Sequence, residues 1–354
     1  MKSLPTVREM ERASVGRDVS YDGVFYLGVR TTGVFCRPSC PARKPRPENV
    51  DYFASAEDAV FAGYRPCKRC RPMDVGGTPP PWISPLLDRV EADPGTRLRD
   101  RDLRALGVDP ARVRRYFLAR HGMTFHAYCR GRRMAGALAS IRRGAEIDDV
   151  VFEHGYESHS GFRDAFARTF GSPPGRARTK DCIVVSLVET PLGPMIVAAT
   201  SAAVCLAEFA SRRMLPAQVE AVKRRFRSAM VPGTNPIIDR TRAELQEYFA
   251  GRLTRFEVPL EAPGTPFQTR VWEALRAIPY GQTRSYEDIA RVVGAPGAVR
   301  AVGTANGMNR IAILIPCHRV IRKNGETGGY GGGRWRKLAL LELEGAGAAA
   351  KTLA

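Results

Sequence analysis

The sequence of 354 residues contains no run of eighteen or more apolar residues, so it predicts no membrane-spanning helix. Its N-terminal stretch, MKSLPTVREMERAS, lacks the apolar centre of a secretion signal. From these two absences we expect a soluble cytoplasmic protein without a membrane partner. The length and a hydrophobic content of 44% are typical of globular chains with roughly two to four domains.

No part of the chain has an acidic surplus either. Lys and Arg outnumber Asp and Glu by 13 to 9 in residues 1–80, by 19 to 12 in residues 81–180 and by 23 to 15 in residues 181–354, and the formal net charge is +19. A surplus spread over the whole body favours a protein that contacts a polyanion at several places, with nucleic acid as the first candidate. An arginine-rich proteome and high solubility remain the plainer explanation.

Stretches rich in Pro and Gly divide the chain. GGTPPPW (residues 76–82) and GSPPGRARTKD (residues 171–181) are typical of linkers, and the second is followed by the β-branched run CIVVSLV. EAPGTPFQ (residues 261–268) is a weaker break. We therefore predict three modules, the last split into two lobes: residues 1–78, 82–178, and 181–264 with 265–350.

Four cysteines form two closely spaced pairs in the first module. Three residues separate Cys36 from Cys40, two separate Cys67 from Cys70, and 26 lie between the pairs. Four thiolates brought together by a loop suit one Zn2+ ion, and disulfides are disfavoured in the cytosol. The zinc could simply stabilise a small domain. Four thiolates around a divalent cation, however, also leave two negative formal charges and a nucleophilic sulfur.

The stretch DGVFYLGVRTTGVFCRPSCPARKPRPENVDYFASAEDAVFAGYRPCKRCRP closely resembles the N-terminal domain of the bacterial Ada proteins. The resemblance implies that zinc-bound Cys36 accepts the methyl group of a methyl phosphotriester in damaged DNA, a choice among the four cysteines that spacing alone does not make. Basic residues near the ligands, among them Arg43, Arg65 and Arg69, are candidates for holding a DNA phosphate.

The same resemblance implies a switch with a simple electrostatic basis. Methylation turns one thiolate into a neutral thioether, so the site loses one of its two negative formal charges. Repulsion from DNA phosphates falls and affinity for DNA is expected to rise. The methylated protein would then activate the transcription of repair genes.

The middle module contains an internal repeat of two short helices. GVDPARVRRYFLARHG (residues 107–122) begins with Asp109 and Pro110 as cap and first turn, and GYESHSGFRDAFARTFG (residues 155–171) has Ser158 as its cap. Each is preceded by a glycine turn and another short helix, and a longer stretch joins the halves. The pattern predicts two recognition helices side by side, with their aromatic residues in the core rather than stacked on bases.

The stretch VFEHGYESHSGFRDAFARTFGSPP resembles the AraC-type DNA-binding domain. The resemblance implies that the module reads double-stranded DNA. The candidates for major-groove and phosphate contacts are the outward positions Arg112, Arg115, His159, Ser160 and Arg163. In RLRDRDLRALG the first supporting helix has alternating charges where family members carry small apolar residues.

The last module places a cysteine beside a histidine in the apolar stretch ILIPCHRVI (residues 313–321). A free thiol has an ordinary pKa of about 8.5, so a nucleophilic cysteine needs a base or a positive environment. The pair alone is a weak signal, because adjacent side chains need not face each other. The wider stretch from TRSYEDIARVV to LALLELEG (residues 283–345) closely resembles the active-site lobe of O6-alkylguanine-DNA alkyltransferases.

This resemblance implies a role for each matching residue. Cys317 attacks the alkyl carbon of O6-methylguanine, with O4-methylthymine as a second substrate. His318 takes the thiol proton through a water, and Glu344 orients the imidazole, which is the logic of a nucleophile, a base and an orienting group. Asn309 braces the active-site turn by hydrogen bonding. A thioether has no evident route back to a thiolate, so each site is expected to act once.

Further residues match those that handle the target base, which must leave the duplex stack to reach the cysteine. Arg300 fills the vacated space, Tyr286 donates a hydrogen bond to the leaving guanine, and Tyr330 belongs to the pocket loop GETGGYGGG. That loop could also suggest a phosphate cradle, but it lacks the lysine and serine of a P-loop.

Together these resemblances imply a multidomain α+β protein. It would comprise a small zinc-bound α/β domain, an all-α AraC-type double helix-turn-helix domain, and an alkyltransferase domain with a β-rich N-terminal lobe and a helical, winged-helix-like active-site lobe. We expect a monomer that contacts alkylated DNA, promoter DNA and RNA polymerase. One alternative is a transcriptional sensor whose C-terminal lobe binds alkylated DNA without transfer, and another is a thiol hydrolase built on Cys317 and His318.

Overall fold

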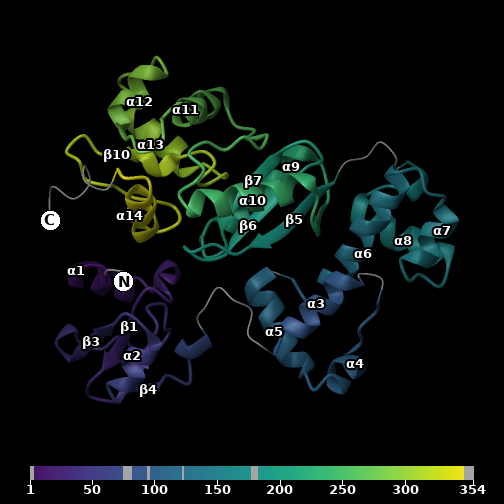
Figure 1. Cartoon of the computed structure of the whole chain (residues 1–354), viewed down its shortest axis with the longest axis horizontal. Coiled ribbons are helices and arrows are strands. Elements are labelled where there is room, and N and C mark those ends of the chain that lie inside the picture. The colour runs from purple at the N-terminus through teal and green to yellow at the C-terminus, as the bar shows by residue number, and fades with distance from the viewer. Residues whose placement is uncertain (1–3, 75–81, 94–95, 122, 177–181, 347–354) are drawn as a thin grey trace.

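The structure, a computed structural model, describes residues 4–74, 82–93, 96–121, 123–176 and 182–346. Figure 1 shows an N-terminal domain, a helical middle domain and a two-lobed C-terminal domain. The predicted multidomain fold is confirmed. Of the two predicted linkers, residues 76–81 and 177–181 lie outside the described residues. Within the described residues, no helix has the length and apolarity that crossing a bilayer requires.

The N-terminal domain is built on a sheet of strand order β3-β1-β2-β4. Its strands are β1 (Tyr26–Val29), β2 (Val34–Cys36), β3 (Val50–Phe53) and β4 (Arg65–Pro66), and its helices are α1 (Val7–Val15) and α2 (Ala56–Phe61). Strand β4 runs parallel to β2, with Val34 opposite Arg65. Because β2 ends at Cys36 and β4 ends directly before Cys67, this parallel pairing brings the two cysteine pairs to the same end of the sheet.

The middle domain has six helices among its described residues: α3 (Ser84–Ala92), α4 (Asp100–Ala105), α5 (Pro110–His121), α6 (Phe125–Arg142), α7 (Ile147–Glu153) and α8 (His159–Phe170). Helix α6 connects the two halves, as the repeat predicts. The Ser158 hydroxyl caps α8 by accepting from Gly161 N. Phe117 of α5 and Phe162 and Phe166 of α8 are at most 1% exposed, which confirms them as core residues.

The N-terminal lobe of the last module is a sheet of order β7-β6-β5-β8 with two helices. Its strands are β5 (Ile183–Val188), β6 (Met195–Ala199), β7 (Val204–Phe209) and β8 (Met230–Pro232), and its helices are α9 (Leu215–Phe226) and α10 (Pro236–Phe249). Helix α6 packs against β8 so closely that a Cβ on Gly131 would lie 2.5 Å from Pro232. The second half of the middle domain thus shares one apolar core with this sheet.

The active-site lobe is helical, with one short parallel strand pair. Its elements are α11 (Pro266–Arg276), β9 (Arg284–Ser285), α12 (Tyr286–Val292), α13 (Val299–Gly307), β10 (Val320–Ile321) and α14 (Arg334–Leu343). Near the start of α14, the Trp335 Nε1–H donates to the carbonyl of Ser20 at 2.6 Å. The Trp335 ring also packs on the core of the N-terminal domain, which lies beside α14 in Figure 1.

Candidate active sites

Cys317 follows a buried apolar turn that joins the two lobes of the last module. Ala312 N donates to the carbonyl of Ala207 in β7 at 2.6 Å, which ties the turn to the sheet. Ile313 has a φ of 73°, a left-handed conformation that is rare and strained for a β-branched residue. Cys317 is 4% exposed. The apolar run therefore buries the cysteine between the two lobes.

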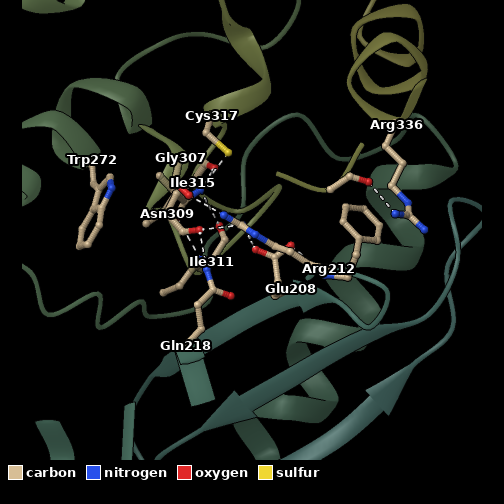
Figure 2. A network of polar contacts seen from close by, with 12 residues as sticks. Glu208, Arg212, Gln218, Trp272, Gly307, Asn309, Ile311, Ile315, Cys317 and Arg336 are labelled. Atoms are coloured by element: carbon tan, nitrogen blue, oxygen red, sulfur yellow. Dashed lines mark hydrogen bonds and ion pairs between the residues drawn. The ribbon is translucent and has the colours of Figure 1, made fainter. Parts of the chain in front are cut away.

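The Asn309 side chain holds this turn from inside. Its Nδ2 donates to Cys317 Sγ at 3.1 Å and to the carbonyl of Ile315 at 2.9 Å, and its Oδ1 accepts from Ile311 N at 3.0 Å. Figure 2 shows these bonds converging on one amide. An amide N–H aimed at the sulfur stabilises a thiolate more than a thiol, so Asn309 both shapes the turn and favours the reactive form.

His318 is fully buried, and its Nε2 lies 2.9 Å from Glu344 Oε1. Because the carboxylate can only accept, we assign the imidazole hydrogen to Nε2. Nδ1, which has no hydrogen-bond partner among the described residues, is then the free lone pair. Burial lowers the pKa of His318 despite the nearby carboxylate, so the ring is neutral at pH 7. Such a ring can take a proton from a thiol directly or through one water.

Glu344 is the hub of the charged network behind His318. Its Oε2 accepts from Arg319 Nε at 2.7 Å, and its Oε1 accepts from Arg319 Nη2 at 2.9 Å and from the Tyr248 hydroxyl at 2.7 Å. Burial alone would raise the pKa of Glu344, but the bonds from His318, Arg319 and Tyr248 bring it down to about 2. The carboxylate is therefore charged throughout the physiological range.

Burial raises the pKa of the Cys317 thiol, and the Asn309 bond and the Arg212 and Lys337 charges oppose this only in part. The resting cysteine is consequently a thiol, which protects it from stray electrophiles. Nucleophilic attack then requires removal of its proton at the moment of reaction.

A cavity of about 230 Å³ opens onto Cys317. Two of the predicted residues, Tyr286 and Tyr330, line it, and the others are Arg212, Gly303, Asn306, Gly307, Ala312, Gly329 and Gly331. Burial raises the pKa of Tyr286, so its hydroxyl remains a donor. Arg300 lies in the first turn of the neighbouring helix α13 with an exposed side chain, outside the cavity.

The second candidate site is the cysteine cluster of the N-terminal domain. The four sulfurs of Cys36, Cys40, Cys67 and Cys70 all lie within 4.8 Å of one another. Tetrahedral zinc with bonds of about 2.3 Å needs sulfurs about 3.8 Å apart, so the cluster fits one zinc ion. Cys40 and Cys70 are buried, whereas Cys36 and Cys67 are partly exposed.

The basic residues around this cluster divide into two groups. Arg37 and Lys44 make contacts within the domain. Arg37 Nε lies 3.4 Å from Asp22 Oδ2, and Lys44 Nζ donates to the carbonyl of Cys40 at 3.1 Å. The side chains predicted to hold phosphate are all exposed: Arg43, Arg65 and Arg69. They leave a cationic rim around an anionic metal site.

The predicted reading residues of the middle domain have different surroundings. Arg112, Arg115 and Arg163 are all exposed, and Arg112 also stacks on the Trp82 ring with its Cζ 4.1 Å from the ring centroid. His159 Nδ1 lies 3.4 Å from Asp148. Arg112 and His159 are thus held by neighbours within the domain.

Several residues of the Cys317 site were not predicted from the sequence: Glu208, Arg212, Tyr248, Asn306, Arg319 and Lys337. Lys337 is fully buried, donates to the carbonyl of Val320 at 2.5 Å, and has its pKa lowered to about 8 by burial. Glu208 and Arg212 offered a signal, since they are oppositely charged and four residues apart beside an apolar strand.

Four family models match the chain in sequence. They are the metal binding domain of Ada (residues 9–73), a helix-turn-helix domain (103–180), and the ribonuclease-like domain (183–262) and DNA binding domain (266–346) of 6-O-methylguanine DNA methyltransferase.

Two curated relatives are similar over most of their length. The regulatory protein ada of Salmonella typhimurium is 34% identical, and the match covers 93% of this chain and 94% of the relative. The bifunctional transcriptional activator/DNA repair enzyme Ada of Escherichia coli K12 is 33% identical over the same shares. Among solved structures, Mycobacterium tuberculosis OGT in complex with DNA is 43% identical over 48% of this chain and 96% of its own, with a TM-score of 0.40.

Proposed function

The chain belongs to the family of bifunctional Ada proteins, and on this premise we propose which of its residues carry out the transfers. The family repairs DNA by moving methyl groups to its own cysteines and regulates transcription through a helix-turn-helix domain. It also binds zinc through four cysteines. The assignment of individual residues rests chiefly on the Asn309–Cys317 and His318–Glu344 contacts beside one cavity.

At the first site, Cys317 accepts the methyl group of O6-methylguanine, and of O4-methylthymine as a second substrate. His318 Nδ1 takes the thiol proton, Sγ attacks the methyl carbon in line, and the carbon–oxygen bond breaks with its electron pair on the base. Glu344 stabilises the imidazolium that forms. Tyr286 donates a hydrogen bond to the leaving guanine, which offsets the negative charge developing on it.

The target base reaches Cys317 only outside the duplex stack. The exposed side chain of Arg300, in the first turn of α13, is suited to fill the vacated space. Tyr330 and the glycine-rich loop enclose the flipped base. This arrangement explains why a deeply buried cysteine can act on DNA.

At the second site, Cys36 accepts the methyl group of a methyl phosphotriester. Cys36, Cys40, Cys67 and Cys70 hold the zinc, which keeps their sulfurs deprotonated and nucleophilic at neutral pH. The exposed Arg43, Arg65 and Arg69 bind the neighbouring phosphates. Exposure does not distinguish Cys36 from Cys67, so this choice rests on the family resemblance.

Loss of one negative charge at Cys36 raises affinity for promoter DNA, which the middle domain reads with Arg115 and Arg163 as candidate contacts. We further propose that the protein is a cytoplasmic monomer that engages RNA polymerase when methylated. The sensor alternative, in which Cys317 binds alkylated bases without transfer, is not favoured, because the complete base-and-orienter network would then have no use.

To test both assignments, the zinc-loaded protein is incubated with excess duplex DNA that has been treated with a methylating agent. A peptide-resolved mass spectrum then locates the transferred methyl groups. One methyl on the Cys36 peptide and one on the Cys317 peptide are expected, with none on the Cys67 peptide. The matched variants Cys36→Ser and Cys317→Ser should each lose only their own methyl. A methyl on neither peptide, with DNA still bound, would replace the repair assignment by the sensor.

A further inference from the structure

Arg212 is a buried arginine that comes from the sheet lobe and ends against the active-site turn. It follows β7 by three residues and is 8% exposed. Its Nη1 donates to Glu208 and, at 3.1 Å, to the carbonyl of Asn309, and its Nη2 donates to the carbonyl of Gly307. Figure 2 shows the guanidinium between Glu208 on one side and the backbone of Gly307 and Asn309 on the other.

The same guanidinium also supports the opposite wall of the cavity. A Cβ built on Gly331 would lie 2.5 Å from Arg212 Cζ and 2.7 Å from its Nη2. The loop that carries Tyr330 therefore rests directly on Arg212, and a side chain at position 331 would displace the guanidinium. Arg212 itself lines the cavity with Cys317.

Glu208 fixes the arginine from below. It is fully buried, and its second oxygen accepts from Phe209 N at 2.9 Å. Gln218 Nε2 adds a bond of 3.3 Å to the carbonyl of Asn309. A buried ion pair is costly unless its hydrogen bonds are satisfied, and it rarely stabilises a fold more than apolar residues would. A role in the site explains its presence better than stability does.

We propose that Arg212, held by Glu208, is a positioning residue for methyl transfer to Cys317. It sets the backbone of Asn309, whose side chain directs the sulfur, and it fixes the distance between the Asn309 turn and the Tyr330 loop that enclose the base. This inference rests on the proposed transfer at Cys317 and adds the sheet lobe to the machinery of that reaction.

Because Arg212 is charged, its loss should change the pH dependence of the transfer rate, which the loss of a purely structural residue would not change. Arg212 and Lys337 favour the Cys317 thiolate, whereas burial and Glu208 oppose it. The other titratable groups that face or neighbour the sulfur are Tyr286, Tyr330 and His318. Loss of Arg212 should therefore raise the pKa of the Cys317 thiol and shift the rate profile to higher pH.

The test compares Arg212→Met with Arg213→Met, since Arg213 is the adjacent arginine and is exposed. The measurement is the single-turnover rate of methyl transfer from saturating O6-methylguanine duplex, from pH 6 to pH 9, in the full zinc-loaded chain. Arg212→Met should slow transfer about 30-fold and shift the profile to higher pH, because small misplacements cost up to about 100-fold. Arg213→Met should stay within about twofold of the wild type, and methylation of Cys36 should be unchanged in both.

Arg212→Lys keeps the charge but replaces the planar guanidinium by a single ammonium, which cannot hold Glu208, Gly307 and Asn309 in the same geometry. It therefore guards against a folding defect. It should be slowed about 5-fold to 10-fold with the wild-type pH profile. Equal rates for Arg212→Met, Arg212→Lys and the wild type would overturn the inference. The inference would also be overturned if Arg212→Lys had the wild-type rate and the slower transfer of Arg212→Met were explained by its lower melting temperature. A wild-type protein that never methylates Cys317 would instead overturn the proposed function.

Discussion

The two candidate acceptor sites reach a nucleophilic sulfur by opposite routes. The cluster around Cys36 is assembled from two short segments at one edge of a small sheet, is partly exposed, and is surrounded by arginines. Cys317 lies 4% exposed in a cavity and depends on residues from both lobes, from Arg212 to Glu344. A metal can activate a sulfur at the surface, where phosphates are accessible, whereas a base-activated thiol needs a shielded pocket and an extruded substrate.

Zinc removal should separate the two sites most sharply. Structural zinc contributes about 10 to 16 kcal/mol to the folding of small domains, so a chelator should unfold the N-terminal domain and abolish methylation of Cys36. Methylation of Cys317 should continue, since among the described residues no contact of Cys317 involves that domain. Peptide mass spectrometry before and after chelation, with zinc added back as the control, measures both. Loss of both activities together would show that the sites are not independent.

Glu344→Gln should affect only the base-activated site, because it removes the charge that stabilises the His318 imidazolium. We expect transfer to Cys317 to slow about 100-fold, within the range of general-base effects. The control is Glu342→Gln, an exposed position at the end of the same helix, which should transfer normally. A Glu344→Gln rate close to that of the wild type would exclude the base-and-orienter assignment.

Acid should destabilise the active-site lobe through the same carboxylate. The pKa of Glu344 is lowered from 4.5 to about 2 in the fold, so its contribution to stability is complete above pH 4.5 and disappears as the pH falls toward 2. A shift of this size corresponds to about 3 kcal/mol. The free energy of unfolding, measured with denaturant between pH 2 and pH 6, should therefore depend less on pH for Glu344→Gln than for Glu342→Gln.

Tyr286→Phe should reduce transfer to Cys317 about 10-fold while leaving Cys36 unaffected, since it removes one hydrogen bond to the leaving base. Single-turnover rates on O6-methylguanine duplex measure the effect. Tyr64→Phe, in the N-terminal domain, is the control for the same substitution. Equal rates for the two variants would show that the Tyr286 hydroxyl does not contact the leaving group.

The smallest expected effect is the affinity change on methylation of Cys36. Removing one negative charge near a phosphate is worth about 1 kcal/mol at moderate dielectric, or about fivefold in affinity. The gain should shrink as salt is raised, because exposed charges are screened. Titration of promoter duplex with methylated and unmethylated protein at several salt concentrations measures it. Equal affinities at every salt concentration would contradict the electrostatic switch.

Local sequence signals were sufficient for elements that depend on nearby residues. The zinc ligands follow from two short spacings, and the Ser158 cap and the phenylalanine face of α8 follow from helical periodicity. Among the Cys317 residues, Asn309 and His318 came from a family resemblance rather than from spacing. Their contacts with Cys317 and Glu344 are properties of the folded chain.

The sequence by itself therefore determined the paired spacing of the zinc cysteines and the cap and apolar face of α8, because these depend on residues close in the chain. Only the tertiary structure decided that Arg319 and Tyr248 share the Glu344 carboxylate, that Arg212 supports the Asn309 turn, and that Trp335 docks on Ser20. The last of these contacts joins residues 315 positions apart. Hydrogen bonds over such separations depend on how whole domains pack, and no spacing or periodicity in the chain encodes them.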